Sequence, residues 1–213
     1  MRRLFAVALL LALVCAGTAL AARGDPQKRL TPADQARAKA MLLRTSDFGL
    51  GFQALPSSPQ KADIYCKALD EADLTLTGEA ESRTFQGGVE FASSVAQVYQ
   101  STRDSAASWK RGTSAAGDAC VHEQFRRGFQ GQGARLERFA RTPFPRLAER
   151  SIAYRLVISS QGVRVFLDVV ALKQGRGQAG LLLGSALTPM PRDEELRLAR
   201  IVARRLARAM QTS

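Results

Sequence analysis

The sequence predicts an α+β fold: a central antiparallel sheet with helices packed on its faces, in αββααββββ-like order, cross-linked by one disulfide. Two stretches of alternating apolar residues, 152–158 and 163–171, flank a turn-forming Ser-Ser-Gln-Gly and predict a hairpin with one apolar face. The final stretch, 193–210, has the apolar period of an amphipathic helix. With 46% hydrophobic and 23% charged residues, the composition is that of a globular protein.

The N-terminal residues 1–21 have the features of a secretory signal peptide. Arg2 and Arg3 precede an uncharged apolar run that ends in an Ala-Leu-Ala cleavage pattern. An uncleaved signal anchor is the alternative, but the run is short for a membrane span and is soon followed by a glycine and a proline. We therefore expect a secreted, extracytoplasmic protein with no transmembrane anchor after cleavage.

Two cysteines, Cys66 and Cys120, remain after cleavage. They predict a disulfide, because an even pair of thiols in an oxidising compartment is usually joined. Two separate buried thiols are the alternative. Cleavage also removes Arg2 and Arg3 and so lowers the formal net charge from +12 to +10. This basic balance favours an acidic partner, although 25 Arg against 6 Lys is also the bias of a GC-rich genome.

The first half of the mature chain predicts a helix followed by a hairpin. Residues 22–30 are polar and broken by glycine and proline, which indicates a flexible N-terminus ahead of a single domain over 31–213. Thr31 is a suitable N-cap, with a proline after it, for a helix to about Arg44. Strands over 74–86 and 89–100 then flank two glycines.

The middle of the chain predicts two short helices. Ser101 or Thr102 can cap the first, and Thr113 can cap the second, which carries Cys120 and ends at a group of glycines. The disulfide would then join this second helix to the region before the first strand. A strand over 134–144 should extend the sheet that the C-terminal hairpin forms.

The register expected for the C-terminal hairpin joins Ile158 to Val163 across the turn. This pairing makes one face of the hairpin wholly apolar. A further strand over 178–187 follows a Gly-Arg-Gly turn, and its Leu181 and Leu183 are expected to join the apolar face.

The opposite face of this hairpin contains Asp168 and Arg155, one diagonal step apart in the expected register. They predict a cross-strand ion pair, and the alternative is an acid at the bottom of a ligand cleft. Gly180 and Gly184 should leave room on this second face for a packed helix or a small apolar ligand.

The closing helix, expected to about Met210, has two different sides. Acidic residues occupy its first turn, where they complement the helix dipole. One side is apolar, with Val202 and Leu206 at its centre, and predicts packing on the sheet. The other side is basic and is either a solvated face or an anion-binding face. Its candidate residues are Arg197, Arg200, Arg204 and Arg208, with Arg205 beside them.

Residue types exclude several chemistries. His122 is the only histidine, so a multi-histidine metal site is excluded, and no cofactor is expected. Gly175, Gly177 and Gly180 match the dinucleotide-binding glycine string, but they join two strands and predict a hairpin turn instead. Aromatic residues are 7% of the chain and do not interleave with the arginines, which argues against nucleic-acid binding.

The leading helix ends in the sequence Met-Leu-Leu-Arg-Thr-Ser-Asp-Phe, up to Phe48. After it come the central helix with Cys120, three long strands and an amphipathic helix. This order resembles the extracellular sensor-like domains of PknH-type actinobacterial serine/threonine kinases and their free-standing secreted relatives, over about residues 31–210. The resemblance implies a PsbP-like α/β sandwich that binds a ligand outside the cell without catalysis. The chain differs in showing no kinase segment and in having one cysteine pair instead of two, so only Cys66 and Cys120 are carried over, as one bridge.

We therefore expect a non-catalytic binding or sensor-like module of the cell envelope. Its partner would be an unknown small ligand or an acidic envelope polymer. A cell-wall-directed hydrolase is one alternative, which requires a deep cleft around His122 or a carboxylate pair such as Glu79 and Glu81. A basic adhesion or envelope-structural protein that binds acidic polymers is the other.

Overall fold

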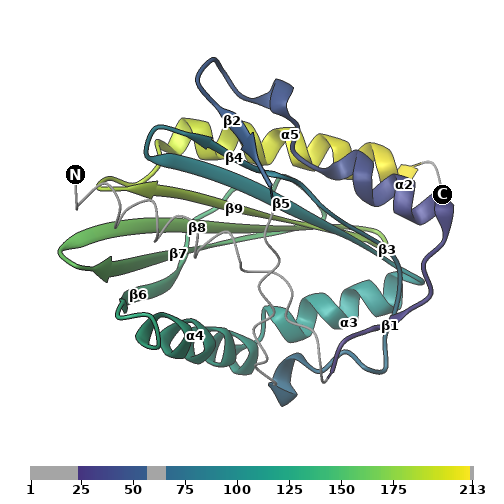
Figure 1. Ribbon diagram of the computed structural model, residues 1–213. Helices are drawn as coiled ribbons and strands as arrows, with labels where there is room; N and C mark the ends of the chain where they lie inside the picture. The colour runs from purple at the N-terminus through teal and green to yellow at the C-terminus, as the bar shows by residue number, and fades with distance from the viewer. Residues whose placement is uncertain (1–23, 57–65, 212–213) are drawn as a thin grey trace.

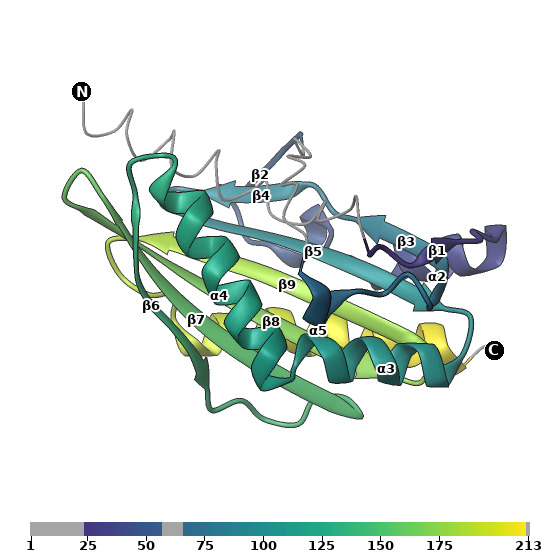
Figure 2. The same cartoon turned by 90° about the horizontal axis from the view of Figure 1, so that it is seen from below.

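A computed structural model of the chain, which describes residues 24–56 and 66–211, has one twisted sheet between two layers of helices (Figures 1 and 2). The strands of the described residues, in chain order, are β1 (Gln27–Lys28), β2 (Gln53–Leu55), β3 (Thr75–Glu81), β4 (Thr84–Gly87), β5 (Glu90–Tyr99), β6 (Arg135–Thr142), β7 (Arg150–Ser160), β8 (Val163–Gln174) and β9 (Gly177–Ala186). They lie in the order β1-β3-β5-β9-β8-β7-β6, with β4 paired to β5 and to β2. All these pairs are antiparallel except β1 with β3, so the predicted α+β class is confirmed. The signal peptide predicted over 1–21 lies outside the described residues.

Helices cover both faces of the sheet. In Figure 1, α2 (Pro32–Met41) and α5 (Arg192–Gln211) lie above the sheet, and α3 (Thr102–Gly112) and α4 (Ala115–Gln130) lie below it. Figure 2 shows α3 and α4 from their own side. Two 3-10 helices, η1 (Thr45–Asp47) and η2 (Lys67–Leu69), complete the described elements. The largest apolar cluster packs α2 and α5 against β5, β8 and β9, and a second packs α4 against β6 to β8.

The helix starts follow the predicted caps closely. The side chain of Thr31 accepts a hydrogen bond from the backbone N–H of Asp34, and that of Ser101 accepts one from Asp104. The cap of α4 is Ser114, one residue after the predicted Thr113. In α5, Val202 and Leu206 are fully buried, as the apolar period predicts.

The register of the C-terminal hairpin differs from the expected one by two residues. Ser160 pairs with Val163, so Ile158 lies opposite Val165 and the turn is only Gln161-Gly162. Both turn residues have positive φ, 51° and 77°, as a tight two-residue hairpin turn requires. A slip of two keeps every side chain on its face, so the predicted apolar face survives the error.

The face predicted for Leu181 and Leu183 is wrong. Leu183 pairs with Asp168, and both leucines pack in the cluster under α2 and α5, opposite the Leu156 face. The room predicted at Gly184 is filled as well, because a Cβ at that position would collide with the ring of Phe91. No space for an apolar ligand is left beside Gly184.

The N-terminal side of the sheet needs two further corrections. Within the segment predicted to be flexible, 22–30, Gln27 and Lys28 pair with β3 as β1, so this segment contains a short strand that the sequence does not predict. The strand predicted over 74–86 is two strands, since the pairing with β5 passes from β3 to β4 at Ser82. The hydroxyl of Ser82 accepts a hydrogen bond from the backbone N–H of Ser94 at 2.8 Å across this break.

A buried carboxylate fixes α2 to the sheet. Asp34 accepts hydrogen bonds from the Thr77 hydroxyl at 2.6 Å and from Arg37 and Arg176 at 2.7 and 3.1 Å. The contact is close enough that a Cβ at Gly78 would collide with the backbone of Asp34. Arg176 belongs to the β8–β9 turn, so the glycine string around it forms a hairpin turn, as predicted.

Acid is expected to weaken the fold through Asp34. Burial raises the pKa of this carboxyl, but the hydrogen bonds from Arg176, Thr77 and Arg37 outweigh it and hold the pKa at about 2, against 3.8 when unfolded. The stabilisation amounts to about 2 kcal/mol; it is present above about pH 4 and is lost as the pH falls through about 2. The free energy of unfolding in urea, measured at about pH 4 and at about pH 2, should differ less between the two pH values in Asp34→Asn than in the parent. Equal pH dependence in the two proteins would contradict this role.

Candidate functional site

The basic side of α5 contains the four predicted arginines, and the structure divides them into two groups. Arg200, Arg204 and Arg208 are exposed, and none of them forms an ion pair within the described residues. Arg197 is tied down: it donates two hydrogen bonds of 2.6 Å to the Glu194 carboxylate and one of 2.8 Å to a backbone carbonyl. The hydrogen bond to Glu194 raises the pKa of Arg197. Three of the four arginines therefore remain available to an anion.

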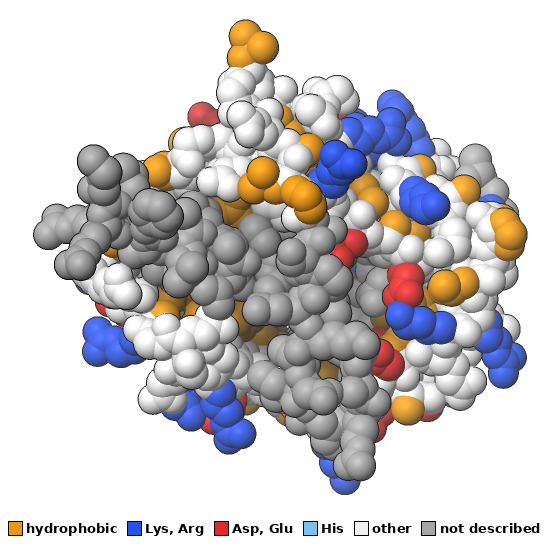
Figure 3. All heavy atoms as spheres, in the orientation of Figure 1, with side chains coloured by type: hydrophobic (Ala, Val, Ile, Leu, Met, Phe, Trp, Pro, Cys, Tyr) orange, Lys and Arg blue, Asp and Glu red, His pale blue; other side chains and the backbone are white. Residues whose placement is uncertain are grey.

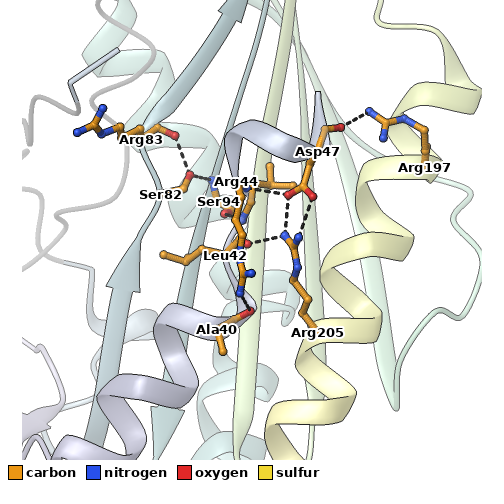
Figure 4. A network of polar contacts seen from close by, with 10 residues as sticks. Ala40, Leu42, Arg44, Asp47, Ser82, Arg83, Ser94, Arg197 and Arg205 are labelled. Atoms are coloured by element: carbon orange, nitrogen blue, oxygen red, sulfur yellow. Dashed lines mark hydrogen bonds and ion pairs between the residues drawn. The ribbon is translucent and has the colours of Figure 1, made fainter. Parts of the chain in front are cut away.

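Arg205 does not belong to the exposed part of this basic side. Its guanidinium donates to both carboxylate oxygens of Asp47, at 2.6 and 2.7 Å, and to the backbone carbonyl of Leu42 at 2.7 Å (Figure 4). The side chains of Arg205 and Asp47 are only 18% and 7% exposed. The Arg44 backbone N–H completes the coordination of Asp47 at 2.7 Å. Arg205 thus joins α5 to η1 and has a structural role.

Several of the Lys and Arg side chains visible in Figure 3 lie at the upper right, over the region of α2 and α5, and others lie at the left, lower and right edges of this view. After Glu195 the sequence has five arginines and no acid up to Ser213. The exposed row on α5 is therefore not neutralised by its own helix.

The predicted disulfide is present. Cys66, just before η2, is bonded to Cys120 in α4, with their Cα atoms 6.3 Å apart. It thereby connects the segment before β3 to the helix below the sheet, as predicted.

The acids and the histidine considered for catalysis belong to three different elements: Glu79 and Glu81 to β3, Asp168 to β8 and His122 to α4. Arg155 and Asp168 are directly opposite and form a two-pronged ion pair of 2.6 and 2.9 Å, which confirms the predicted pairing. Glu79 is paired with Lys28 at 2.6 Å. His122 is exposed, with its ring 5.6 Å from that of Phe139.

A second candidate site is a depression of about 830 Å³ where the β7–β8 hairpin meets the end of α4. Arg135, Arg164, Glu137, Ser159 and Leu187 contribute to its lining. Glu137 lies between the two arginines, 3.1 Å from Arg164 and 3.6 Å from Arg135. A hydrogen bond from Ser159, and then the two arginines, lower the pKa of Glu137, which burial opposes.

Sequence patterns do not single out this second site. Arg135 and Arg164 are 29 positions apart, and they meet only because both strands flank β7. The register of β6 also shifts between Leu136 and Arg138, so Glu137 breaks the alternation that would predict its face.

Among the described residues, no helix is both long and apolar enough to cross a bilayer. The same residues contain no group of three or more His, Cys, Asp or Glu side chains that could hold a metal ion.

No family model matches the chain, and no curated protein is similar to it. Among solved structures, it is similar to the extracellular domain of PknH from Mycobacterium tuberculosis, with a TM-score of 0.45 and 9% identity, over 85% of this chain and 98% of that one. It is also similar to an Rv0999 ortholog from Mycobacterium smegmatis, with a TM-score of 0.43 and 18% identity, over 81% and 98%. The PknH extracellular domain, which the order of elements resembles, is thus among the structures similar to this chain.

Proposed function

We propose that the protein is a non-catalytic binding module of the cell envelope that docks on an acidic polymer through Arg200, Arg204 and Arg208. The observation that carries this proposal is the row of three exposed arginines without ion pairs among the described residues. In α4, by contrast, Arg126 and Arg127 are both paired with Glu123 on their own helix. The α5 row has no such internal partner.

The spacing of the row suits a chain of regularly repeated anions. The three arginines are four residues apart, so successive Cα atoms rise by about 6 Å and the row spans about 12 Å along α5. The apolar side of α5 packs on the sheet and Arg205 joins the helix to η1, so the row is presented on a rigid support. A rigid support lowers the entropy that binding must overcome.

The compartment is proposed from the disulfide and the sequence. Structural disulfides persist in oxidising compartments outside the cytoplasm. The Cys66–Cys120 bond supports an extracytoplasmic location, in agreement with the signal peptide expected over residues 1–21.

Binding to polyphosphate-coated beads at physiological salt tests this role. Changing Arg200, Arg204 and Arg208 together to Gln should weaken binding about tenfold, because each exposed contact contributes about 0.5 kcal/mol. The melting temperature should stay unchanged, since all three side chains are exposed.

A matched control separates the row from net charge. Gln at Arg83, Arg103 and Arg138 removes the same three charges from exposed positions elsewhere. We expect this control to bind polyphosphate nearly as well as the parent. Equal weakening in both triple variants would mean that overall charge, and not the α5 row, attracts the polymer.

A further inference from the structure

The depression at the β7–β8 hairpin brings two arginines together through strand register. Arg135 pairs with Ser159 in β7, and Ser159 pairs with Arg164 in β8, so the three residues form one row across adjacent strands. Directly paired residues share a face of the sheet, and neighbouring strands are about 4.8 Å apart. Two guanidinium groups therefore flank one hydroxyl on a single face.

The β-bulge in β6 places a carboxylate between these arginines. The shift of register between Leu136 and Arg138 allows the Glu137 side chain, 20% exposed, to reach both guanidinium groups. Arg135 is 79% exposed, and its 3.6 Å contact is too long for a hydrogen bond. The cluster has two positive charges against one negative charge, so it can accept one more oxyanion.

Leu187 adds an apolar contact in an unusual conformation. Its φ is 77°, and the residue is 65% exposed although its backbone N–H donates a hydrogen bond to the carbonyl of Arg164 at 2.9 Å. The only other described non-glycine residue with positive φ is Gln161, which also lines the depression and whose conformation the hairpin turn explains. No turn of that kind explains Leu187, and strained residues of this sort gather at binding sites.

The apolar contact continues along the same face. Two pairs further along β7 and β8, Val157 lies opposite Phe166, and both side chains are half-buried. A ligand with its anion at the arginines would thus have an apolar surface on either side of it.

We propose that this depression is a second binding site, for a small ligand that combines one carboxylate or phosphate group with a short apolar chain. Arg135 and Arg164 bind the oxyanion as a pair, and Leu187 contacts the apolar chain. Glu137 lies between the two guanidinium groups and competes with the ligand for them. The site is separate from the α5 row, so an experiment can refute one of the two proposals and leave the other standing.

Hexyl phosphate is a suitable probe, because it contains both chemical parts. A ligand of this size is expected to bind with a dissociation constant of about 1 mM. Titration followed by NMR should perturb the amides of Arg135, Ser159 and Arg164 in a saturable way. Inorganic phosphate and hexanol, which each have one part, should bind at least about tenfold more weakly. Absence of saturable binding up to about 10 mM, or perturbations confined to other residues, would overturn the site.

Three variants test the roles of the side chains. Changing both Arg135 and Arg164 to Gln should weaken hexyl phosphate binding at least about tenfold, as expected for the loss of two charge-assisted contacts. Glu137→Gln should tighten binding, because it removes the competing carboxylate. Leu187→Asn should keep or raise the melting temperature, since Asn tolerates positive φ, and should weaken binding of the hexyl chain.

These variants also distinguish a binding site from a purely structural ion cluster. A structural cluster would lose stability in Glu137→Gln and show no gain in affinity, and this result would contradict the proposal. The α5 triple variant is the control, and it should bind hexyl phosphate like the parent. Loss of binding in that variant would place the phosphate at α5 and refute the second site.

Discussion

Replacing Arg205 by methionine is expected to lower the free energy of unfolding by about 3–5 kcal/mol. The substitution leaves the Asp47 carboxylate, 7% exposed, without its cation and removes a hydrogen bond to the Leu42 carbonyl. Methionine retains an apolar stem of similar length, so the loss reports the charge and its hydrogen bonds. Equilibrium unfolding in urea measures the difference.

Arg204 is the matched control for this experiment, because it is the adjacent residue on the same helix and is exposed. Arg204→Met should change the free energy of unfolding by no more than about 0.5 kcal/mol. Combining Arg205→Met with Asp47→Leu should lower the free energy of unfolding by less than the sum of the two single changes, because neither charge is then left buried alone. Equal costs at positions 204 and 205 would refute the structural role of Arg205.

Removing the disulfide has an expected effect of similar size. Cys66 and Cys120 are 54 positions apart, and closing a loop of that length in the unfolded chain stabilises the fold by about 4 kcal/mol. Changing both cysteines to serine should therefore lower the free energy of unfolding by about this amount, a large part of a stability of about 5–15 kcal/mol.

Thiol counting is the control for this second prediction. The exported, unfolded protein should contain no alkylatable thiol before reduction and two after it. Two thiols before reduction, or serine variants as stable as the parent, would contradict the proposed contribution of the bond.

The elements of the C-terminal half could be predicted because their patterns are strong. Alternation over 152–171 predicts both strands, and the apolar period predicts the buried side of α5. The register could not be predicted, because nothing in the residue types shows that Gln161 adopts positive φ while Ser159 and Ser160 remain in the strand. A turn of two residues instead of four then shifts every pair.

The roles of the arginines depend on partners that are distant in sequence. Helical periodicity puts Arg205 near the boundary between the two sides of α5, and its partner Asp47 is 158 positions away. Neither residue type nor spacing predicts that pair. The depression is still harder to predict from the sequence, because its row of Arg135, Ser159 and Arg164 depends on the register of three strands and on a bulge.

The salt dependence of polyphosphate binding is the most direct test of the proposed docking role. Each phosphate contact to a single-stranded polyanion contributes about 0.7 to the slope of log K against log salt. If Arg200, Arg204 and Arg208 each contact a phosphate, the triple Gln variant should have a slope about 2 smaller in magnitude than the parent. The Arg83, Arg103 and Arg138 control should keep the parent slope. A triple variant with the same slope as the parent would contradict docking through α5.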